Sequence, residues 1–552
     1  MVSLGRFLTQ LVCRFKEIIF IAAIFIAVAV PYLEYDYFSG DEIVPASLAV
    51  NTIIGNPNGR HTSVYINALG RILPVNRICA YDFALPAYFL IPFIKIFGVS
   101  IYLVKIVAAG ISLLYLLVLF AVIAMLFGRQ TALVTVVLLE VSPLFIHYAR
   151  SGFNTTEPII NLIFISSVYC FLIYKRRHNN IYIYAAVFLL GACLSVKLSA
   201  FSRYLGILAG FIIVYPKRIV PFIRASGLYR NLLLAVFFSC GAFLFLYYNA
   251  AAEGRSFALV NCLTRNEPTF SGEKNSDIIQ HARQRIKQFA SFAADAVPYH
   301  SLETAAVSRA VSGISLLLFF AAFIAVLLSA LRESSPERNK IIFIYVFFIT
   351  GFLTTLFSPG SFRPFHLSIL YPFVQLVIAL FVVGMFNSRD NISVKRAVAA
   401  IVLITALAVK GTLLYDYHSA YAKVSKSNNT NDEAIGGLIE YIELNKLFPC
   451  VFSDFGTDEA VFYLSKARVA SFDVGGGIFE QGKIKTVGYM KRQASVYGNI
   501  YVVETPQKKK QKLSRLKEYA VSKGIRIEIV KKIAEKNSGE ARYIIYRIHQ
   551  VN

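Results

Sequence analysis

The chain has 552 residues, of which 56% are hydrophobic and only 16% are charged, and its mean hydropathy is +0.58. A soluble protein of this size has no means of burying so much apolar surface, so the composition predicts a polytopic α-helical membrane protein. In a soluble protein the net charge of +24 would suggest a nucleic-acid partner. Here much of the positive charge lies in short loops between apolar segments, which indicates membrane orientation and contact with anionic lipids, with no nucleic acid involved.

Apolar segments recur up to residue 424 and predict about eleven membrane-spanning helices. A basic start, followed by an apolar run without an evident cleavage site, indicates a retained signal-anchor helix. A shorter segment, residues 83–97, contains prolines and is expected to lie at the interface or to insert halfway. The predicted spans are residues 17–32, 101–127, 131–141, 158–174, 181–196, 201–215, 231–250, 311–331, 341–357, 367–386 and 397–414.

The distribution of positive charge predicts how these spans are oriented. Lys and Arg dominate the N-terminus and the loops at 128–130, 175–180, 216–230, 332–340 and 388–396, which places them in the cytoplasm. The opposite compartment then receives every conspicuous polar feature, including an amphipathic helix expected at 277–292. These features are the long loops at 33–84 and 251–309, the turn at 142–157 and the C-terminus. We expect a multi-pass protein of the plasma (inner) membrane.

From about residue 425 the composition changes to that of a soluble domain. Strands are predicted at 449–454, 499–505, 525–533 and 542–548, and amphipathic helices at 432–445 and 511–523. The chain is therefore expected to comprise a transmembrane domain, residues 1–424, and a small extracytoplasmic α/β domain, residues 425–552.

Acidic residues at two predicted helix starts are the first candidates for chemistry. Asp41 and Glu42 precede an apolar-periodic run, residues 43–54, that ends at a glycine, and Glu157 stands directly before a proline. Both positions suit carboxylates that stabilise a helix N-terminus. A capping Asp is also held ionised, as a general base must be, so a structural cap and a catalytic acid–base role both remain open.

Several cationic residues lie at or within predicted spans near the same membrane face. A charge at membrane depth costs a few kcal/mol, so such residues usually face a partner or a wet cavity. Snorkelling to lipid headgroups explains each one equally well when it is taken alone. Together, beside two acidic positions, they suggest a lipid-linked phosphate held next to an acid–base pair. The candidates are Lys105, Arg150, Lys197, Arg203, Arg363 and His366.

No other catalytic motif competes with this arrangement. The chain has no HExxH, Walker A or GxSxG pattern, and its 8 histidines show no metal-ligand spacing. The 7 cysteines are scattered, without CxxC spacing, and are expected to be small apolar residues. The sequence therefore predicts no metal site.

The order of these features resembles that of the GT-C glycosyltransferases. More narrowly, it resembles the protein O-mannosyltransferase-like superfamily that includes the lipid A aminoarabinose transferases. The similarity extends over nearly all of the membrane part. The matching segments are Asp41 with Glu42 (first acidic motif), residues 85–98 (interfacial helix), 142–158 (second acidic loop), 194–197 (short turn) and 363–372 (late element).

This resemblance implies a GT-C fold and an inverting transfer of sugar from a polyprenyl or dolichyl phosphate to a lipid, glycan or protein acceptor. It implies that Asp41 is the general base and that Glu42 or Glu157 orients the acceptor or tunes Asp41. The cations would bind the donor phosphate, so no cofactor is required, and the need for a divalent metal remains open. The alternative is a lipid-linked sugar flippase or transporter, which also needs intramembrane charges.

Overall fold

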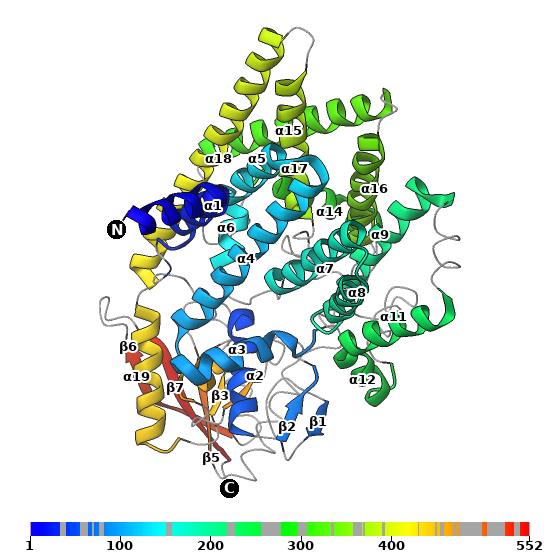
Figure 1. The fold of residues 1–552 in the computed structure, drawn as a ribbon. Coiled ribbons are helices and arrows are strands. Elements are labelled where there is room, and N and C mark those ends of the chain that lie inside the picture. The colour runs from blue at the N-terminus through cyan, green and yellow to red at the C-terminus, as the bar shows by residue number, and fades with distance from the viewer. Residues whose placement is uncertain are drawn as a thin grey trace.

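The structure is a computed structural model, and it describes most of the chain (Figure 1). The described residues are 2–31, 33, 40–55, 64–68, 71–76, 82–150, 157–217, 227–254, 278–295, 306–332, 336–356, 367, 370–388, 392–428, 430–447, 450–452, 457–466, 471–473, 499–504, 525–534 and 541–550. Side chains at some helix and strand ends, those of Asp41 and Glu42 among them, lie outside this description.

Helices dominate the membrane part, because long runs of Leu, Ile, Val, Phe and Ala satisfy their backbone internally while they present apolar side chains to lipid. These helices are α1 (Val2–Ala29), α4 (Ile101–Phe127), α5 (Arg129–Glu140), α6 (Pro143–Arg150), α7 (Glu157–Arg177), α8 (Asn180–Leu194), α9 (Ala200–Val214), α11 (Gly227–Gly241), α12 (Phe243–Ala251), α15 (Ala306–Arg332), α16 (Pro336–Leu356), α17 (Tyr371–Asn387) and α18 (Ile392–Asn428).

The predicted number of eleven spans is not confirmed. Among the described helices, four are long and apolar enough to cross a membrane, namely α4, α7, α15 and α18, and up to six spans result if each of two bent helix pairs counts as one. A span needs about 20 helical residues, because each residue adds only 1.5 Å along the axis. Predicted spans at α8 and α9 fall on helices of 15 residues, which are too short for a full crossing.

One of the bent pairs corrects the predicted wet turn at residues 142–157. The chain breaks by 70° between α5 and α6, directly before Pro143, whose missing N–H ends the ladder of α5. All eight residues of α6 are buried. The first half of the predicted turn is therefore a buried helix, in which Leu, Phe, Ile and Ala fill half of the positions.

Glycines allow the helices α8 and α11 to approach closely in the membrane part. A Cβ atom at Gly191 of α8 would lie 2.1 Å from the carbonyl oxygen of Phe238 in α11, and one at Gly241 would lie 2.0 Å from that of Phe188. The contact is thus reciprocal, as in small-residue packing between membrane helices. It fixes the end of α8, from which the chain continues to Lys197.

The first long loop contains regular structure next to the membrane part. Helix α2 (Gly40–Ile54) agrees with the predicted periodic run, and β1 (Tyr65–Ala68) and β2 (Arg71–Pro74) form an unpredicted antiparallel hairpin. Helix α3 (Leu85–Phe97) coincides with the predicted interfacial helix. Its large side chains Phe93, Ile96 and Phe97 are exposed, which suits a helix lying at the membrane surface. In the second long loop, the predicted amphipathic helix is α14 (Ile278–Ala293).

The C-terminal part forms a mixed five-stranded sheet in the order β4-β3-β5-β7-β6. We call residues 430–550 the C-terminal module. Its predicted boundary at residue 425 falls inside α18, which is continuous to Asn428. The elements are α19 (Thr430–Leu444), β3 (Cys450–Phe452), α20 (Thr457–Leu464), β4 (Ser471–Asp473), β5 (Asn499–Glu504), β6 (Ile525–Ala534) and β7 (Ala541–Gln550). The predicted helix at 511–523 lies outside the described residues.

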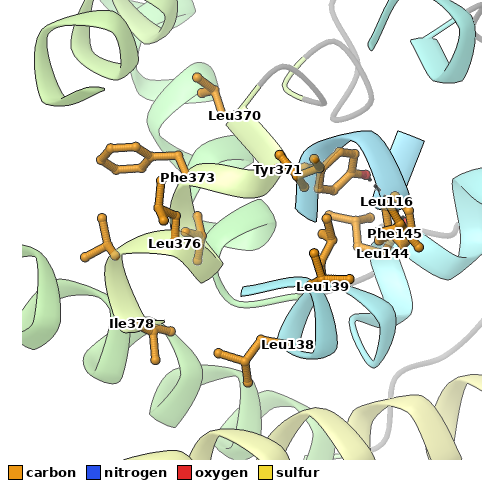
Figure 2. Packing of buried hydrophobic residues seen from close by; sticks show 14 of the residues in the cluster. Leu116, Leu138, Leu139, Leu144, Phe145, Leu370, Tyr371, Phe373, Leu376 and Ile378 are labelled. Carbon is orange, nitrogen blue, oxygen red and sulfur yellow. Dashed lines mark hydrogen bonds between the residues drawn. The ribbon is translucent and has the colours of Figure 1, made fainter. Parts of the chain in front are cut away.

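Two hydrophobic cores hold these parts together. One joins α2, α3, α4, α7 and α8 to the C-terminal module, which lies beside α2 and α3 in Figure 1. The other joins α1, α4, α5, α6, α15, α17 and α18. Figure 2 shows the second core, where Tyr371 of α17 lies against Phe145 of α6, with ring centroids 6.1 Å apart. Each core adjoins one of two buried groups of charged residues.

Candidate active site

Glu157 is the centre of the first buried charged group. It is the first residue of α7, where the helix dipole stabilises a carboxylate, and it is only 2% exposed. Its Oε1 lies 3.4 Å from Lys197 Nζ, and its Oε2 lies 3.3 Å from Arg203 Nη2. The structure therefore brings together three residues that the sequence proposed as separate candidates.

Arg203 lies along one face of α7. Its Nη2 also donates a hydrogen bond of 2.6 Å to Asn161 Oδ1, and its Nη1 donates to the carbonyl of Ser199 at 3.4 Å. The ring centroid of Phe164 lies 6.0 Å from the guanidinium carbon. Glu157, Asn161 and Phe164 follow the i, i+4, i+7 spacing of one helix face, so the primary structure of α7 dictates this cradle for the guanidinium group.

Lys197 is held between Glu157 and a second acid, Asp82. Its Nζ lies 3.9 Å from Asp82 Oδ1. The backbone supports this contact, because Asp82 and Lys197 form an isolated antiparallel bridge and the N–H of Phe83 donates to the carbonyl of Val196 at 3.0 Å. The end of the first loop is thereby bonded to the turn that follows α8.

We call Glu157, Lys197, Arg203, Asp82 and Asn161 the Glu157 cluster. Its two cations and two carboxylates balance formally. None of these four charged residues is more than 4% exposed, so each charge depends on its partners to offset a desolvation cost of several kcal/mol. The cluster can hold a tetrahedral anion only if that anion is met by positive charge, which Lys197 and Arg203 provide.

A second buried group lies at the break between α5 and α6. Asp295, two residues beyond α14, accepts a hydrogen bond from Ser142 Oγ on one oxygen and pairs with Lys410 Nζ on the other. Lys410 is in α18 and is 1% exposed, and Asp295 is 3% exposed. We call these three residues the Asp295 cluster. It ties the second long loop to α18 and to the α5–α6 break.

Arg150 belongs to the surroundings of the second group rather than the first. Its Nη1 lies 3.4 Å from His418 Nδ1, and its guanidinium carbon lies 5.9 Å from the centroid of the Tyr417 ring. His147, one turn earlier on α6, contacts the hydroxyl of Tyr417 at 3.2 Å. Lys410 of the same helix contacts Asp295, which bonds to Ser142 directly before α6. Residues of α18 therefore hold both the start and the end of α6 in place.

Tyr371 of α17 packs against aromatic rings of α6 and α14. Its ring centroid lies 6.1 Å from that of Phe145, 6.2 Å from that of Tyr148 and 4.9 Å from that of Phe292. Its hydroxyl donates to the carbonyl of Leu144 at 3.5 Å. Tyr371 thus ties the start of α17 to α6.

The other predicted site residues fall in several places. Lys105 is 2% exposed in α4, and its Nζ lies 3.5 Å from the carbonyl oxygen of Leu33, at the start of the first long loop. Asp41 and Glu42 are the second and third residues of α2, inside the helix rather than at a cap, and their side chains lie outside the description. Arg363 and His366 lie outside the described residues.

Sequence reasoning missed four residues of these clusters. In the sequence, Asp82 is an acidic residue of the first loop and Lys410 is a single cation within an apolar span. Neither pattern indicates which residue each one contacts. Asn161 and Asp295 carried no signal of their own, because their roles depend on helix register and on contacts across more than 100 residues. Over the described residues, no three His, Cys, Asp or Glu side chains are grouped as metal ligands.

The fold and the clusters define a multi-pass membrane protein with buried ion pairs, one of them beside the short buried helix α6. The family of dolichyl-phosphate-mannose-protein mannosyltransferases matches residues 84–244, a segment that includes Lys105, Arg150, Glu157, Lys197 and Arg203. No curated protein sequence matches the chain.

Solved structures extend this likeness over the whole chain. ArnT from Cupriavidus metallidurans, bound to undecaprenyl phosphate, has a TM-score of 0.57 at 12% identity, with 97% of this chain and 98% of that chain covered. The oligosaccharyltransferase of Archaeoglobus fulgidus in the apo form has a TM-score of 0.54 at 13% identity, with coverages of 92% and 71%. The chain has the GT-C fold, and its resemblance to the GT-C glycosyltransferases is confirmed.

Proposed function

We propose that the chain transfers a sugar from a polyprenyl-phosphate donor to a lipid, glycan or protein acceptor, with inversion, on the extracytoplasmic face of the membrane. The observation that carries this proposal is the Glu157 cluster, in which one carboxylate orients two buried cations within the segment similar to the mannosyltransferases. The similar ArnT binds undecaprenyl phosphate, and AglB from Archaeoglobus fulgidus, with a TM-score of 0.50, is in complex with a dolichol-phosphate. Both likenesses support a lipid-linked donor.

The chemistry begins with the acceptor hydroxyl. Asp41 takes its proton, and the acceptor oxygen bonds to the anomeric carbon while the bond from that carbon to the phosphate oxygen breaks. The bonding electrons leave with the polyprenyl phosphate. Asp41 stands in the first turn of α2, and negative charge is favourable at a helix N-terminus in general.

The leaving phosphate gains negative charge as the bond breaks, and it is a weak base, so it needs cations rather than a general acid. Lys197 and Arg203 supply this charge. Arg203 is suited to it, because its buried Nε donates no hydrogen bond to any described residue. Further candidates for the donor phosphate are Lys105, Arg150, Arg363 and His366.

Glu157 then acts as a positioning acid. Both of its oxygens face cations, so it orients Lys197 and Arg203 for the donor phosphate. Glu42, which follows Asp41 in the sequence, is the candidate for orienting the acceptor hydroxyl. No step requires a cofactor, and the need for a divalent metal is left to experiment.

Purified protein in detergent, incubated with labelled polyprenyl-phosphate sugar and membrane lipids, tests the proposal. Transfer of the label with release of polyprenyl phosphate is the expected result. Asp41→Asn keeps the side-chain shape and removes the base, so transfer should fall by about 10²- to 10⁴-fold. Asp36→Asn, in the same loop, is the matched control and should remain active.

The same assay separates transfer from transport. A flippase moves its substrate only across a sealed membrane, so it would show no transfer in detergent but would move labelled lipid in proteoliposomes. That pair of results, or full activity of Asp41→Asn, would overturn the proposal.

A further inference from the structure

We propose that Tyr463 of the C-terminal module is a positioning residue that fixes α2, and with it Asp41, relative to the Glu157 cluster. This inference rests on the proposed function, in which Asp41 is the base. In this role the C-terminal module holds a catalytic helix in place. The alternative role for the module is recruitment of the acceptor.

The first observation is a pair of hydrogen bonds between distant parts of the chain. The Tyr463 hydroxyl accepts from the N–H of Ser100 at 3.2 Å and donates to the carbonyl of Ser100 at 3.1 Å. Tyr463 is fully buried. Ser100 is the extended residue directly before α4, where the first amides of a helix have no carbonyl partner within the helix. One side chain of the C-terminal module therefore caps α4.

The second observation concerns the helix that carries Tyr463. Helix α20 belongs to the core that includes Ile43, Ala46 and Val50 of α2. These positions follow the i, i+3, i+7 spacing of one helix face. Val461 of α20, which is fully buried, belongs to the same core. The helix that begins with Gly40 and Asp41 is consequently packed between α3 and the C-terminal module.

The third observation connects α4 to the Glu157 cluster. Val104, Val107 and Ala108 of α4 share a core with Ile160 and Ile163 of α7, the helix that starts at Glu157. Tyr463 thus contacts the start of α4 directly while its own helix packs on α2. A shift at Tyr463 would move the acidic turn of α2 relative to α7, and misplacement by about 1 Å can cost about 100-fold in rate.

Tyr463→Phe is the test, because it removes only the hydroxyl and keeps the ring in the core. We expect kcat to fall by about tenfold or more, with KM for donor and acceptor within about twofold of the original protein. Amide hydrogen exchange should accelerate in α2 and in the first turn of α4, while α15 should be unchanged. Tyr441→Phe is the matched control, since its hydroxyl makes no described hydrogen bond.

Three outcomes would overturn the inference. A higher acceptor KM with kcat unchanged would indicate acceptor recruitment. A lower melting temperature with kcat unchanged, measured well below that temperature, would indicate a purely structural contact. Unchanged hydrogen exchange in α2 would contradict the inference without any reference to activity. Absence of transfer in the original protein would instead contradict the proposed function. The hydrogen-exchange measurement would then still test whether Tyr463 fixes α2.

Discussion

The two buried clusters differ in how fully their charges are satisfied. In the Asp295 cluster each carboxylate oxygen has a direct donor, Ser142 on one side and Lys410 on the other. In the Glu157 cluster the charged groups are 3.3 to 3.9 Å apart, and Arg203 keeps an N–H without an acceptor among the described residues. Both oxygens of Asp295 thus have donors, whereas a donor of Arg203 in the Glu157 cluster remains unused among the described residues.

The two clusters also differ in how far apart their residues lie in the sequence. The Asp295 cluster joins segments separated by 115 and 153 residues, and it ties the second long loop to α18 and to the α5–α6 break. The Glu157 cluster comes from residues 46 or fewer positions apart on consecutive helices and turns, with Asp82 added from the first loop. We infer that the Asp295 cluster holds the fold and that the Glu157 cluster holds the substrate.

The largest expected effect comes from Glu157→Gln. It removes the carboxylate partner of Arg203 and one of the two carboxylates that contact Lys197, which should cost about 3–5 kcal/mol of stability. It also releases both cations from their orientation toward the donor phosphate. Transfer should fall by about 100-fold or more. Thermal unfolding and sugar transfer measure the two effects. Near-normal transfer would show that the donor phosphate binds outside the Glu157 cluster.

Lys410→Met should cost stability of a similar size, about 3–5 kcal/mol, because Asp295 is left buried without its cation. The double variant Asp295→Leu with Lys410→Met removes both charges, and buried pairs replaced in this way are often neutral or stabilising. We expect the double variant to recover its melting temperature and its transfer activity. If stability recovers and activity does not, the Asp295 cluster takes part in the reaction, and its assignment to the fold alone is wrong.

The contrast also explains what the sequence could predict. Composition and hydropathy were sufficient for a polytopic helical protein, and the order of acidic and basic motifs was sufficient for the GT-C resemblance. Glu157, Lys197 and Arg203 were each proposed, because charged residues at membrane depth are conspicuous. Their mutual contacts depend on how α7 and α9 pack and on a backbone bridge from Asp82, and no single segment encodes these.

The count of eleven spans is not confirmed, and there is a physical reason why composition gives a higher count than helix length does. Apolar composition marks residues that avoid water, but it does not distinguish a full crossing from a short helix buried in protein. α6 shows the opposite case, because it was predicted as part of a turn although its polar residues Arg150 and His147 are buried through contacts with α18. Partners in a distant helix, which the local sequence does not reveal, satisfy those polar groups.

Gly241→Ala tests the support of the Glu157 cluster without touching its charges. The added Cβ would lie 2.0 Å from the carbonyl oxygen of Phe188, so α8 and α11 must separate at a cost of about 1–3 kcal/mol. Since α8 leads to Lys197, we expect transfer to fall together with stability. Gly110→Ala, where a Cβ meets nothing within 4 Å, is the control and should behave like the original protein.

Arg203→Lys should have a smaller effect on stability and a distinct effect on binding. Lysine keeps the charge but loses the planar fork that contacts Glu157, Asn161 and the carbonyl of Ser199 together. Loss of such bonds should weaken binding of polyprenyl phosphate by roughly tenfold, which corresponds to about 1.4 kcal/mol. Binding of the lipid to purified protein measures this. Equal affinity would assign the phosphate to other cations.

Glu140→Gln should have the smallest effect. Glu140 ends α5 and is fully buried, and neither carboxylate oxygen accepts a hydrogen bond from any described residue. A neutral amide of the same shape avoids the cost of burying an ionised group, so the melting temperature should stay constant or rise and transfer should be unchanged. Glu140 lies two residues before Ser142 of the Asp295 cluster. A marked loss of transfer with a normal melting temperature would therefore show that the region we assign to the fold also carries a charge that the reaction needs.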